Sequence, residues 1–282
     1  MTISDPVSVT ASVIMNSEAA ERQFLMSLRA PACFPTPAPG QFVMIGVENG
    51  RDPLLRRPFS IHAFDRREDC AVVEIMYQIA GGGTKQLSRL LPDAEVSVMG
   101  PLGRGFTVVP GRKNVVIIAG GVGMAPLCFL AGHYRSLIRP DETAATAMSS
   151  RIICYIGAKT AAFLSGMEKM EDRCEEIKIS TDDGSLGYHG AVVDLFRKDI
   201  PFYNPDDTRI YACGPVPMLK KLAEILAGKG ILCQVSMEER MACGLGACLG
   251  CAVSSRGSDG KITYKRACKD GPVFNIQDVI WT

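Results

Sequence analysis

The first hundred or so residues alternate short apolar runs with polar, Pro-rich or Gly-rich stretches. The clearest apolar runs lie at 23–28, 41–47 and 71–77. Short strands separated by regular turns are typical of a small antiparallel barrel. A short helix is expected at 84–91, directly after a glycine triplet. We therefore predict an antiparallel β-barrel domain over residues 1–110.

From about residue 111 the pattern changes to strand-like runs that alternate with helical stretches. The predicted strands lie at 115–119, 151–156, 177–180, 209–212 and 231–235, and the clearest helices at 126–138 and 216–227. This alternation indicates a parallel, doubly wound α/β sheet. We place the boundary at 111–114 and predict that this second domain covers residues 111–235.

One uncharged stretch, 115–132, is nearly long enough to span a membrane. Gly120, Gly121, Gly123 and Pro126 interrupt its centre, so a strand, a Gly turn and a buried helix explain it better. The first residues lack a basic region followed by a long apolar run, which argues against a secretory signal. A net charge of +1 without Lys/Arg runs gives no indication of nucleic-acid binding. We expect a cytoplasmic protein that binds neither membrane nor nucleic acid.

Residues 236–282 are rich in Cys and Gly and have too few apolar residues for a core of their own. The chain has eleven cysteines, an odd number, which argues against a disulfide framework. Four of them form the spacing C-x4-C-x2-C-x16-C, namely Cys243, Cys248, Cys251 and Cys268. This is the plant-type [2Fe–2S] spacing, and the intervening glycines allow the backbone to approach the cluster. A structural zinc site is the alternative, although zinc usually takes paired C-x2-C knuckles.

Two motifs of the first domain indicate a flavin site. In the string Arg57-Pro58-Phe59-Ser60, the arginine can bind a pyrophosphate beside a rigid proline turn. The serine hydroxyl can face a flavin ring. Downstream, the glycine triplet before Thr84 begins a helix whose backbone N–H groups form an anion site. Either motif alone could be an ordinary turn, but together they favour a flavin.

Two glycine motifs of the second domain indicate a nicotinamide site at the ends of predicted strands. Gly120, Gly121 and Gly123 follow the first strand, without forming the usual G-x-G-x-x-G fingerprint. The string Cys213-Gly214-Pro215 follows a later strand and would lie at the mouth of the same cleft. A structural turn at the first motif and a structural role for the cysteine are the alternatives.

These motifs together resemble the ferredoxin reductase superfamily, through R-x-[FY]-S, G-G-x-G-x-A-P and C-G-P. Four longer strings narrow the resemblance to the electron-transfer subunits of NAD-dependent dihydroorotate dehydrogenases. They lie at 54–61, 83–85, 237–244 and 270–274. The resemblance covers nearly the whole chain, and 237–244 is its most specific part.

The resemblance implies FAD in the barrel, a [2Fe–2S] cluster and NAD as co-substrate. It implies that FAD is contacted by Arg57, Pro58, Phe59 and Ser60. Its adenine or ribityl side would be lined by Met76, Tyr77 and Gln78. The pyrophosphate would be held by Gly83 and Thr84. Gln78 stands where the family usually has Arg, so a charged contact with phosphate is in doubt there. The implied partner is an FMN-containing dihydroorotate dehydrogenase catalytic subunit, in a heterotetramer with two copies of each chain.

Electron counting explains why the three groups would occur together. NAD takes a hydride, which carries two electrons, whereas a [2Fe–2S] cluster takes one electron at a time. Flavin exchanges electrons both ways and therefore belongs between them. The expected order is partner FMN, cluster, FAD and NAD⁺, in pyrimidine biosynthesis. The three predicted sites account for the whole chain, so no segment is left for a dihydroorotate site. We also expect no catalytic acid or base in this chain.

Several alternatives stay open at this point. The chain could be the diaphorase subunit of a bifurcating ferredoxin–NADP transhydrogenase, a hydrogenase or a sulfite reductase. It could also be a non-enzymatic regulator with a metal knuckle, which would bind no flavin. The choice between NAD and NADP is also open, because Lys159 suits a 2′-phosphate whereas Asp182 and Asp183 oppose one.

Overall fold

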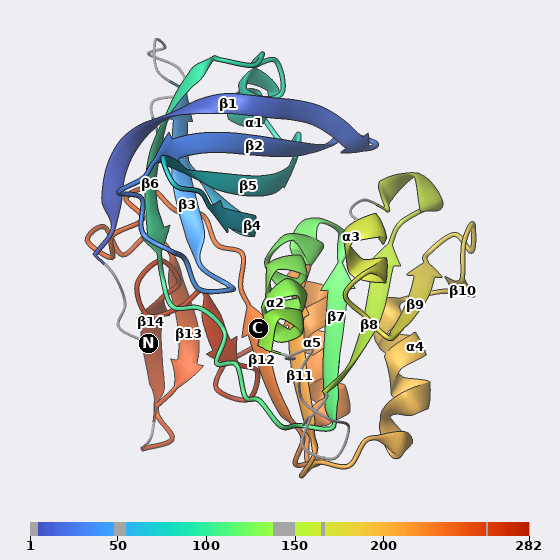
Figure 1. Ribbon diagram of the computed structural model, residues 1–282. Helices are drawn as coiled ribbons and strands as arrows, with labels where there is room; N and C mark the ends of the chain where they lie inside the picture. The colour runs from blue at the N-terminus through green and yellow to red at the C-terminus, as the bar shows by residue number, and fades with distance from the viewer. Residues whose placement is uncertain (1–4, 48–54, 138–149, 165–166, 258, 282) are drawn as a thin grey trace.

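The computed structural model describes residues 5–47, 55–137, 150–164, 167–257 and 259–281. Leu54, the first residue of the string at 54–61, and Ile138, the last residue of the helix predicted at 126–138, lie outside the described residues. The chain forms a barrel, an α/β sheet and a small hairpin that lies beside both (Figure 1). These parts match the predicted fold class of antiparallel barrel, doubly wound sheet and small cysteine-rich C-terminal unit.

The barrel closes in the strand order β1-β2-β5-β4-β3-β6. Its strands are β1 (Val7–Ala20), β2 (Gln23–Pro31), β3 (Phe42–Val47), β4 (Arg57–Arg66), β5 (Cys70–Gln78) and β6 (Glu95–Leu102). Alternate side chains such as Val43, Ile45, Val73 and Ile75 are fully buried in the barrel interior, as the two-residue period of a strand requires. Helix α1 (Gly82–Leu87) confirms the short helix predicted at 84–91, but it begins two residues earlier, within the glycine triplet, and ends four residues earlier.

The second sheet has the strand order β10-β9-β8-β7-β11-β12-β15. Its strands are β7 (Asn114–Gly120), β8 (Arg151–Ala158), β9 (Glu176–Thr181), β10 (Tyr188–His189), β11 (Thr208–Cys213), β12 (Leu232–Ser236) and β15 (Val273–Asn275). All neighbouring strands are parallel except β15, which pairs antiparallel with β12. The five strands predicted here are confirmed. The apolar runs of β7 and β8 are continuous because these central strands are buried on both faces of the sheet.

Helices cover both faces of this sheet. They are α2 (Met124–Leu137), α3 (Met167–Glu171), α4 (Val192–Asp199) and α5 (Val216–Leu226), with short 3₁₀ turns η1 (Gly121–Gly123), η2 (Ala161–Phe163) and η3 (Ile200–Phe202). Val115 and Ile117 face a core that includes α2, whereas Val116 and Ile118 face the core of α4 and α5. The uncharged stretch is thus a strand, a turn and a buried helix. No helix in the described part of the chain is long and apolar enough to cross a membrane.

The cysteine-rich segment adds the hairpin β13 (Ala252–Arg256) and β14 (Ile262–Arg266). Its apolar side chains, such as Val253 and Ala267, join the core on the α4–α5 side of the sheet. The same core includes Phe42 and Met44 of the barrel. This segment therefore obtains its apolar environment from both neighbours.

Barrel and sheet are joined by direct contacts. Gln23 donates a side-chain hydrogen bond to the carbonyl of Phe163 at 3.0 Å, and Glu74 of β5 forms an ion pair with Lys169 of α3. Helix α2 packs against β4 (Figure 1). The barrel is thereby held over the carboxyl ends of the parallel strands, where doubly wound sheets bind ligands.

Candidate functional site

A hollow of about 320 Å³ lies between the barrel and the second sheet. We call it the barrel-side hollow. Its walls come from all three predicted segments: Phe42, Pro58, Phe59, Ser60, Met76, Tyr77, Gln78, Ala80, Val122, Ala125, Met237, Glu238, Glu239, Met241 and Pro272. Mostly apolar walls with a few polar groups are typical of a cofactor site.

Six of the predicted flavin residues line this hollow, namely Pro58, Phe59, Ser60, Met76, Tyr77 and Gln78. They lie on β4 and at the end of β5, which are neighbours in the barrel. The predicted rigid turn at Arg57–Ser60 is wrong in one respect, because these residues already form the first part of β4 and pair with β3. The strand fixes the register of Ser60, and Tyr77 is held by a 2.9 Å hydrogen bond from its hydroxyl to Asn16.

Three further predicted flavin residues lie outside the walls of the barrel-side hollow. The guanidinium of Arg57 donates to the carbonyl of Leu55 at 2.6 Å. Gly83 is buried within α1. The hydroxyl of Thr84 accepts the backbone N–H of Ala80 at 2.9 Å, so it caps the start of its own helix. Their proposed contacts with FAD stay predictions.

The sequence interpretation missed several wall residues of the barrel-side hollow. Val122 and Ala125 follow β7, and Met237, Glu238 and Glu239 follow β12. The string at 237–244 was noted for its resemblance, but only the tertiary fold brings its first residues to the barrel. Burial raises the pKa of Glu239 above the ordinary carboxyl value.

A second hollow, of about 570 Å³, lies at the carboxyl ends of β7, β8 and β9. We call it the sheet-end hollow. Its walls are Glu21, Arg22, Gln23, Gln78, Gly120, Gly121, Val122, Gly157, Ala158, Lys159, Phe163, Asp182, Ala191, Val192, Pro215, Met218 and Glu238. Three residues, Gln78, Val122 and Glu238, belong to the walls of both hollows. Ligands bound in the two hollows would therefore be neighbours.

The predicted nicotinamide residues divide into two groups in the structure. Gly120, Gly121 and Pro215 line the sheet-end hollow. Gly121 has a φ of +54°, and a Cβ there would meet no atom within 4 Å. By contrast, a Cβ on Gly123 would lie 2.4 Å from the carbonyl oxygen of Cys213, so this glycine serves the packing of turn against strand.

Cys213 and Gly214 lie behind the wall of the sheet-end hollow. The side chain of Cys213 is 1% exposed, and burial raises the pKa of its thiol well above the ordinary value. A buried, protonated thiol is a poor nucleophile. A Cβ on Gly214 would lie 2.5 Å from the methyl group of Met218. Both residues therefore pack behind the residues that line the hollow.

The four cysteines of the C-x4-C-x2-C-x16-C motif lie in two contacting pairs, Cys243 with Cys248 and Cys251 with Cys268. Backbone N–H groups point at the sulfurs, with Leu245 N at 3.4 Å from Cys243 Sγ. Hydrogen bonds from the backbone of Cys248 and Leu245 lower the pKa of Cys243 to about 6. The thiolate is the form that binds metal.

The donor set fits a binuclear iron–sulfur cluster, because each of its two irons takes two thiolates. Gly244 and Gly246 have φ values of +71° and +80°, which let the loop curl round the sulfurs. A Cβ on Gly246 would lie 2.7 Å from the side chain of Lys269. Within the described residues, no three His, Cys, Asp or Glu side chains converge to hold a single metal ion.

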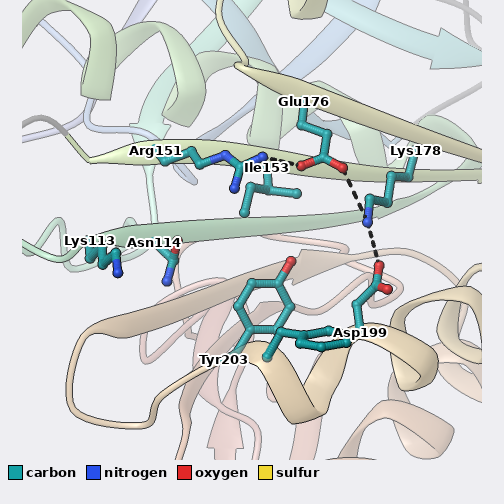
Figure 2. Close-up of a pocket in the computed structure, with 9 residues that line it drawn as sticks. Lys113, Asn114, Arg151, Ile153, Glu176, Lys178, Asp199 and Tyr203 are labelled. Carbon is teal, nitrogen blue, oxygen red and sulfur yellow. Dashed lines mark hydrogen bonds and ion pairs between the residues drawn. The ribbon is translucent and has the colours of Figure 1, made fainter.

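A third hollow, of about 350 Å³, lies at the opposite, amino-terminal edge of the sheet (Figure 2). Four of its charged side chains, Arg151, Glu176, Lys178 and Asp199, form ion pairs with one another. Arg151 pairs with Glu176 at 2.5 Å and Lys178 pairs with Asp199 at 2.6 Å; both pairs are drawn as dashed lines in Figure 2. Asp199 also accepts the hydroxyl of Tyr155 at 2.7 Å. These pairs tie β8, β9 and α4 together, which is a structural role.

Comparison with known proteins agrees with this architecture. Residues 238–280 match the iron-sulfur cluster binding domain of dihydroorotate dehydrogenase B. The dihydroorotate dehydrogenase B (NAD(+)) electron transfer subunit of Desulforamulus reducens is 38% identical over 96% of this chain and 97% of the relative. A solved NADH-dependent reduced ferredoxin–NADP oxidoreductase gives a TM-score of 0.80 at 26% identity, over 96% of this chain and 90% of that one. A ferredoxin NADP⁺ reductase from Neisseria gonorrhoeae, solved with bound FAD and NADP, gives 0.62 at 15% identity, over 79% and 92%.

The barrel held over a doubly wound sheet defines a protein of the ferredoxin reductase class, to which a four-cysteine segment has been added. The identity and coverage then decide the family. This chain belongs to the dihydroorotate dehydrogenase B (NAD(+)) electron transfer subunits. The resemblance inferred from the motifs is confirmed.

Proposed function

We propose that this chain carries electrons from an FMN-containing dihydroorotate dehydrogenase catalytic subunit to NAD⁺, in pyrimidine biosynthesis. The observation that carries the proposal is the wall shared by the two hollows, formed by Gln78, Val122 and Glu238. It makes a ligand on the barrel the neighbour of a ligand at the sheet ends. FAD, when bound, supplies the exchange between electron pairs and single electrons.

The residues of the barrel-side hollow fit the ring of a flavin. Pro58, Phe59 and Val122 provide apolar contacts that exclude water. Ser60 offers a hydroxyl, fixed by the pairing of its strand with Phe42. Gln78 lies where the two hollows meet and orients ligands through its amide. Arg57, Gly83 and Thr84 hold the phosphate side of FAD in this proposal.

The cysteine loop would hold the [2Fe–2S] cluster through Cys243, Cys248, Cys251 and Cys268. Apolar side chains between these ligands face solvent: Leu245 is 51% exposed and Leu249 is 63% exposed. Single electrons have to cross from the partner at this loop. We therefore place the docking surface for the FMN-containing subunit there, in an assembly of two copies of each chain. A cytoplasmic location is part of the same proposal.

A second candidate function follows from the structural likeness to the NADH-dependent reduced ferredoxin–NADP oxidoreductase, with its TM-score of 0.80. In that case the chain would serve as the diaphorase subunit of a bifurcating complex. The two functions differ in the partner, because a bifurcating complex requires ferredoxin and a second nucleotide.

Co-purification of the native chain tests the proposal. We expect an FMN-containing partner, and FAD and iron in this chain. The isolated chain should reduce artificial acceptors with NADH and leave dihydroorotate unchanged, whereas the complex should couple dihydroorotate oxidation to NAD⁺ reduction. A partner without a dihydroorotate site, or a colourless chain with zinc on its thiols, would refute the proposal.

The docking surface has its own variant and control. Leu249→Glu adds a charge at the cysteine loop, and we expect it to weaken partner binding at least tenfold while NADH-acceptor activity is kept. Leu232→Glu is the matched control, because Leu232 is 52% exposed on β12, away from the loop. If the two substitutions weaken partner binding equally, the docking surface does not lie at this loop.

A further inference from the structure

The sheet-end hollow has a defined direction, which places the two halves of a dinucleotide. Its wall is shared with the barrel-side hollow at Gln78, Val122 and Glu238, so the redox-active ring must lie at that end. The wall then follows the strand order from β7 through β8 to β9 and ends at Lys159 and Asp182. The other half of the dinucleotide, with its adenosine ribose, extends toward these two residues.

Backbone hydrogen bonds hold the segments after β8 and β9 together. The N–H of Asp182 donates to the carbonyl of Ala158 at 3.1 Å, and that of Asp183 donates to the carbonyl of Lys159 at 3.3 Å. The Ser185 hydroxyl accepts the N–H of Ala161 at 2.8 Å. The position of Asp182 at the far end of the hollow is therefore fixed by the backbone on both sides.

The two neighbouring aspartates have different tasks. The carboxylate of Asp183 accepts the N–H and the hydroxyl of Ser185, at 3.0 and 2.6 Å, and is thereby committed to its own turn. The carboxylate of Asp182 lines the hollow and, within the described residues, makes no ion pair. Only Asp182 is thus available to a ligand.

We propose that Asp182 selects NAD over NADP by accepting the hydroxyls of the adenosine ribose and repelling a 2′-phosphate. This inference rests on the proposed function of the sheet-end hollow. A carboxylate is the usual partner of ribose hydroxyls in dinucleotide sites. A 2′-phosphate beside it would bring a second negative charge close to the carboxylate, which is repulsive. Lys159 attracts a 2′-phosphate at the same end of the hollow and limits the selectivity that Asp182 imposes.

Calorimetric titration with two probes that lack the nicotinamide ring tests this role without an activity assay. The probes are ADP-ribose and 2′-phospho-ADP-ribose, added to the full chain with its cofactors. The wild-type protein should prefer ADP-ribose. Asp182→Asn keeps the size of the side chain and removes its charge, so the preference should fall about tenfold. Asp182→Ser should show the same change.

Two controls make the result specific. Asp183→Asn should keep the preference within about twofold, because its carboxylate faces Ser185 rather than the hollow. Lys159→Gln should increase the preference for ADP-ribose. If Asp182→Asn leaves the ratio of the two affinities unchanged, even where both affinities fall equally, the role of Asp182 is refuted. The proposed nucleotide site in the sheet-end hollow is kept in that case. If the wild-type protein binds neither probe, the proposed nucleotide site itself fails.

Discussion

His62 gives the most direct test of how the barrel and the sheet are joined. This residue of β4 is 1% exposed, and within the described residues neither ring nitrogen makes a hydrogen bond of good geometry. Burial, followed by the positive charge of Lys169, lowers the pKa of His62 to about 4. Glu74 acts in the opposite direction, and Arg173 adds to the lowering. The imidazole is therefore neutral in the folded protein at pH 5.

The effect on stability follows from the difference between folded and unfolded chains. In the unfolded chain His62 titrates near its ordinary pKa of 6.5. Between pH 6.5 and 4 the unfolded state binds more protons, so stability falls as the pH is lowered through this window. From pH 7 to pH 5 the loss due to His62 is about 2 kcal/mol. For a chain of this size that corresponds to roughly 4–8 °C in melting temperature.

Scanning calorimetry of the cofactor-loaded protein at pH 7 and pH 5, at one scan rate, measures this contribution. His62→Leu removes the titrating group and fills the same apolar space, so its melting temperature should fall several degrees less than that of the wild type. Other titrating groups cancel in this comparison. His189→Gln, at an exposed position, should keep the wild-type response. If His62→Leu and the wild type lose the same number of degrees, His62 is not the buried neutral group described above.

Two further substitutions test the packing of the turn and the ligands of the cluster. Gly123→Ala places a Cβ 2.4 Å from the backbone of Cys213. It should lower the free energy of unfolding by about 1–3 kcal/mol, which thermal melting measures. It should also weaken ADP-ribose binding, which calorimetric titration measures. Gly81→Ala is its control, because a Cβ there meets nothing within 4 Å; similar melting of both variants would contradict the packing argument. Cys251→Ser should abolish bound iron and visible absorbance, whereas Cys33→Ser, at an exposed thiol, should keep both. Iron retained by Cys251→Ser would exclude that cysteine as a ligand.

The parts of the fold that could be predicted are those in which the local pattern reports burial directly. The strand at 115–119 is apolar throughout, and the strand at 151–156 is apolar after Arg151, because helices cover both faces of their sheet. β1 (Val7–Ala20) was not recognised, because half of its residues are exposed and its conformation depends on pairing with β2 and β6. The string beginning at Arg57 suggested a turn because it contains proline, although its strand is set by pairing with β3.

The candidate site shows the same division between local and long-range information. The four cysteines and the residues Pro58–Ser60 could be predicted as site residues because their types and spacing indicate the chemistry. Glu238 and Val122 could not be placed at the barrel, since they reach it only through the docking of the sheet. Burial of Cys213 likewise depends on long-range packing, so its motif alone suggested a position at the mouth of the cleft.

The strand β15 (Val273–Asn275) has a consequence for any attempt to exchange parts between reductases. Its antiparallel pairing with β12 joins the cluster-bearing segment to the nucleotide-binding sheet through backbone hydrogen bonds. Removing that segment would leave the N–H and C=O groups of β12 that face β15 unpaired and open to strands from other molecules, while the opposite edge of β12 stays paired with β11. Fusing this segment to another reductase would succeed only where the recipient sheet has an unpaired edge strand of matching register.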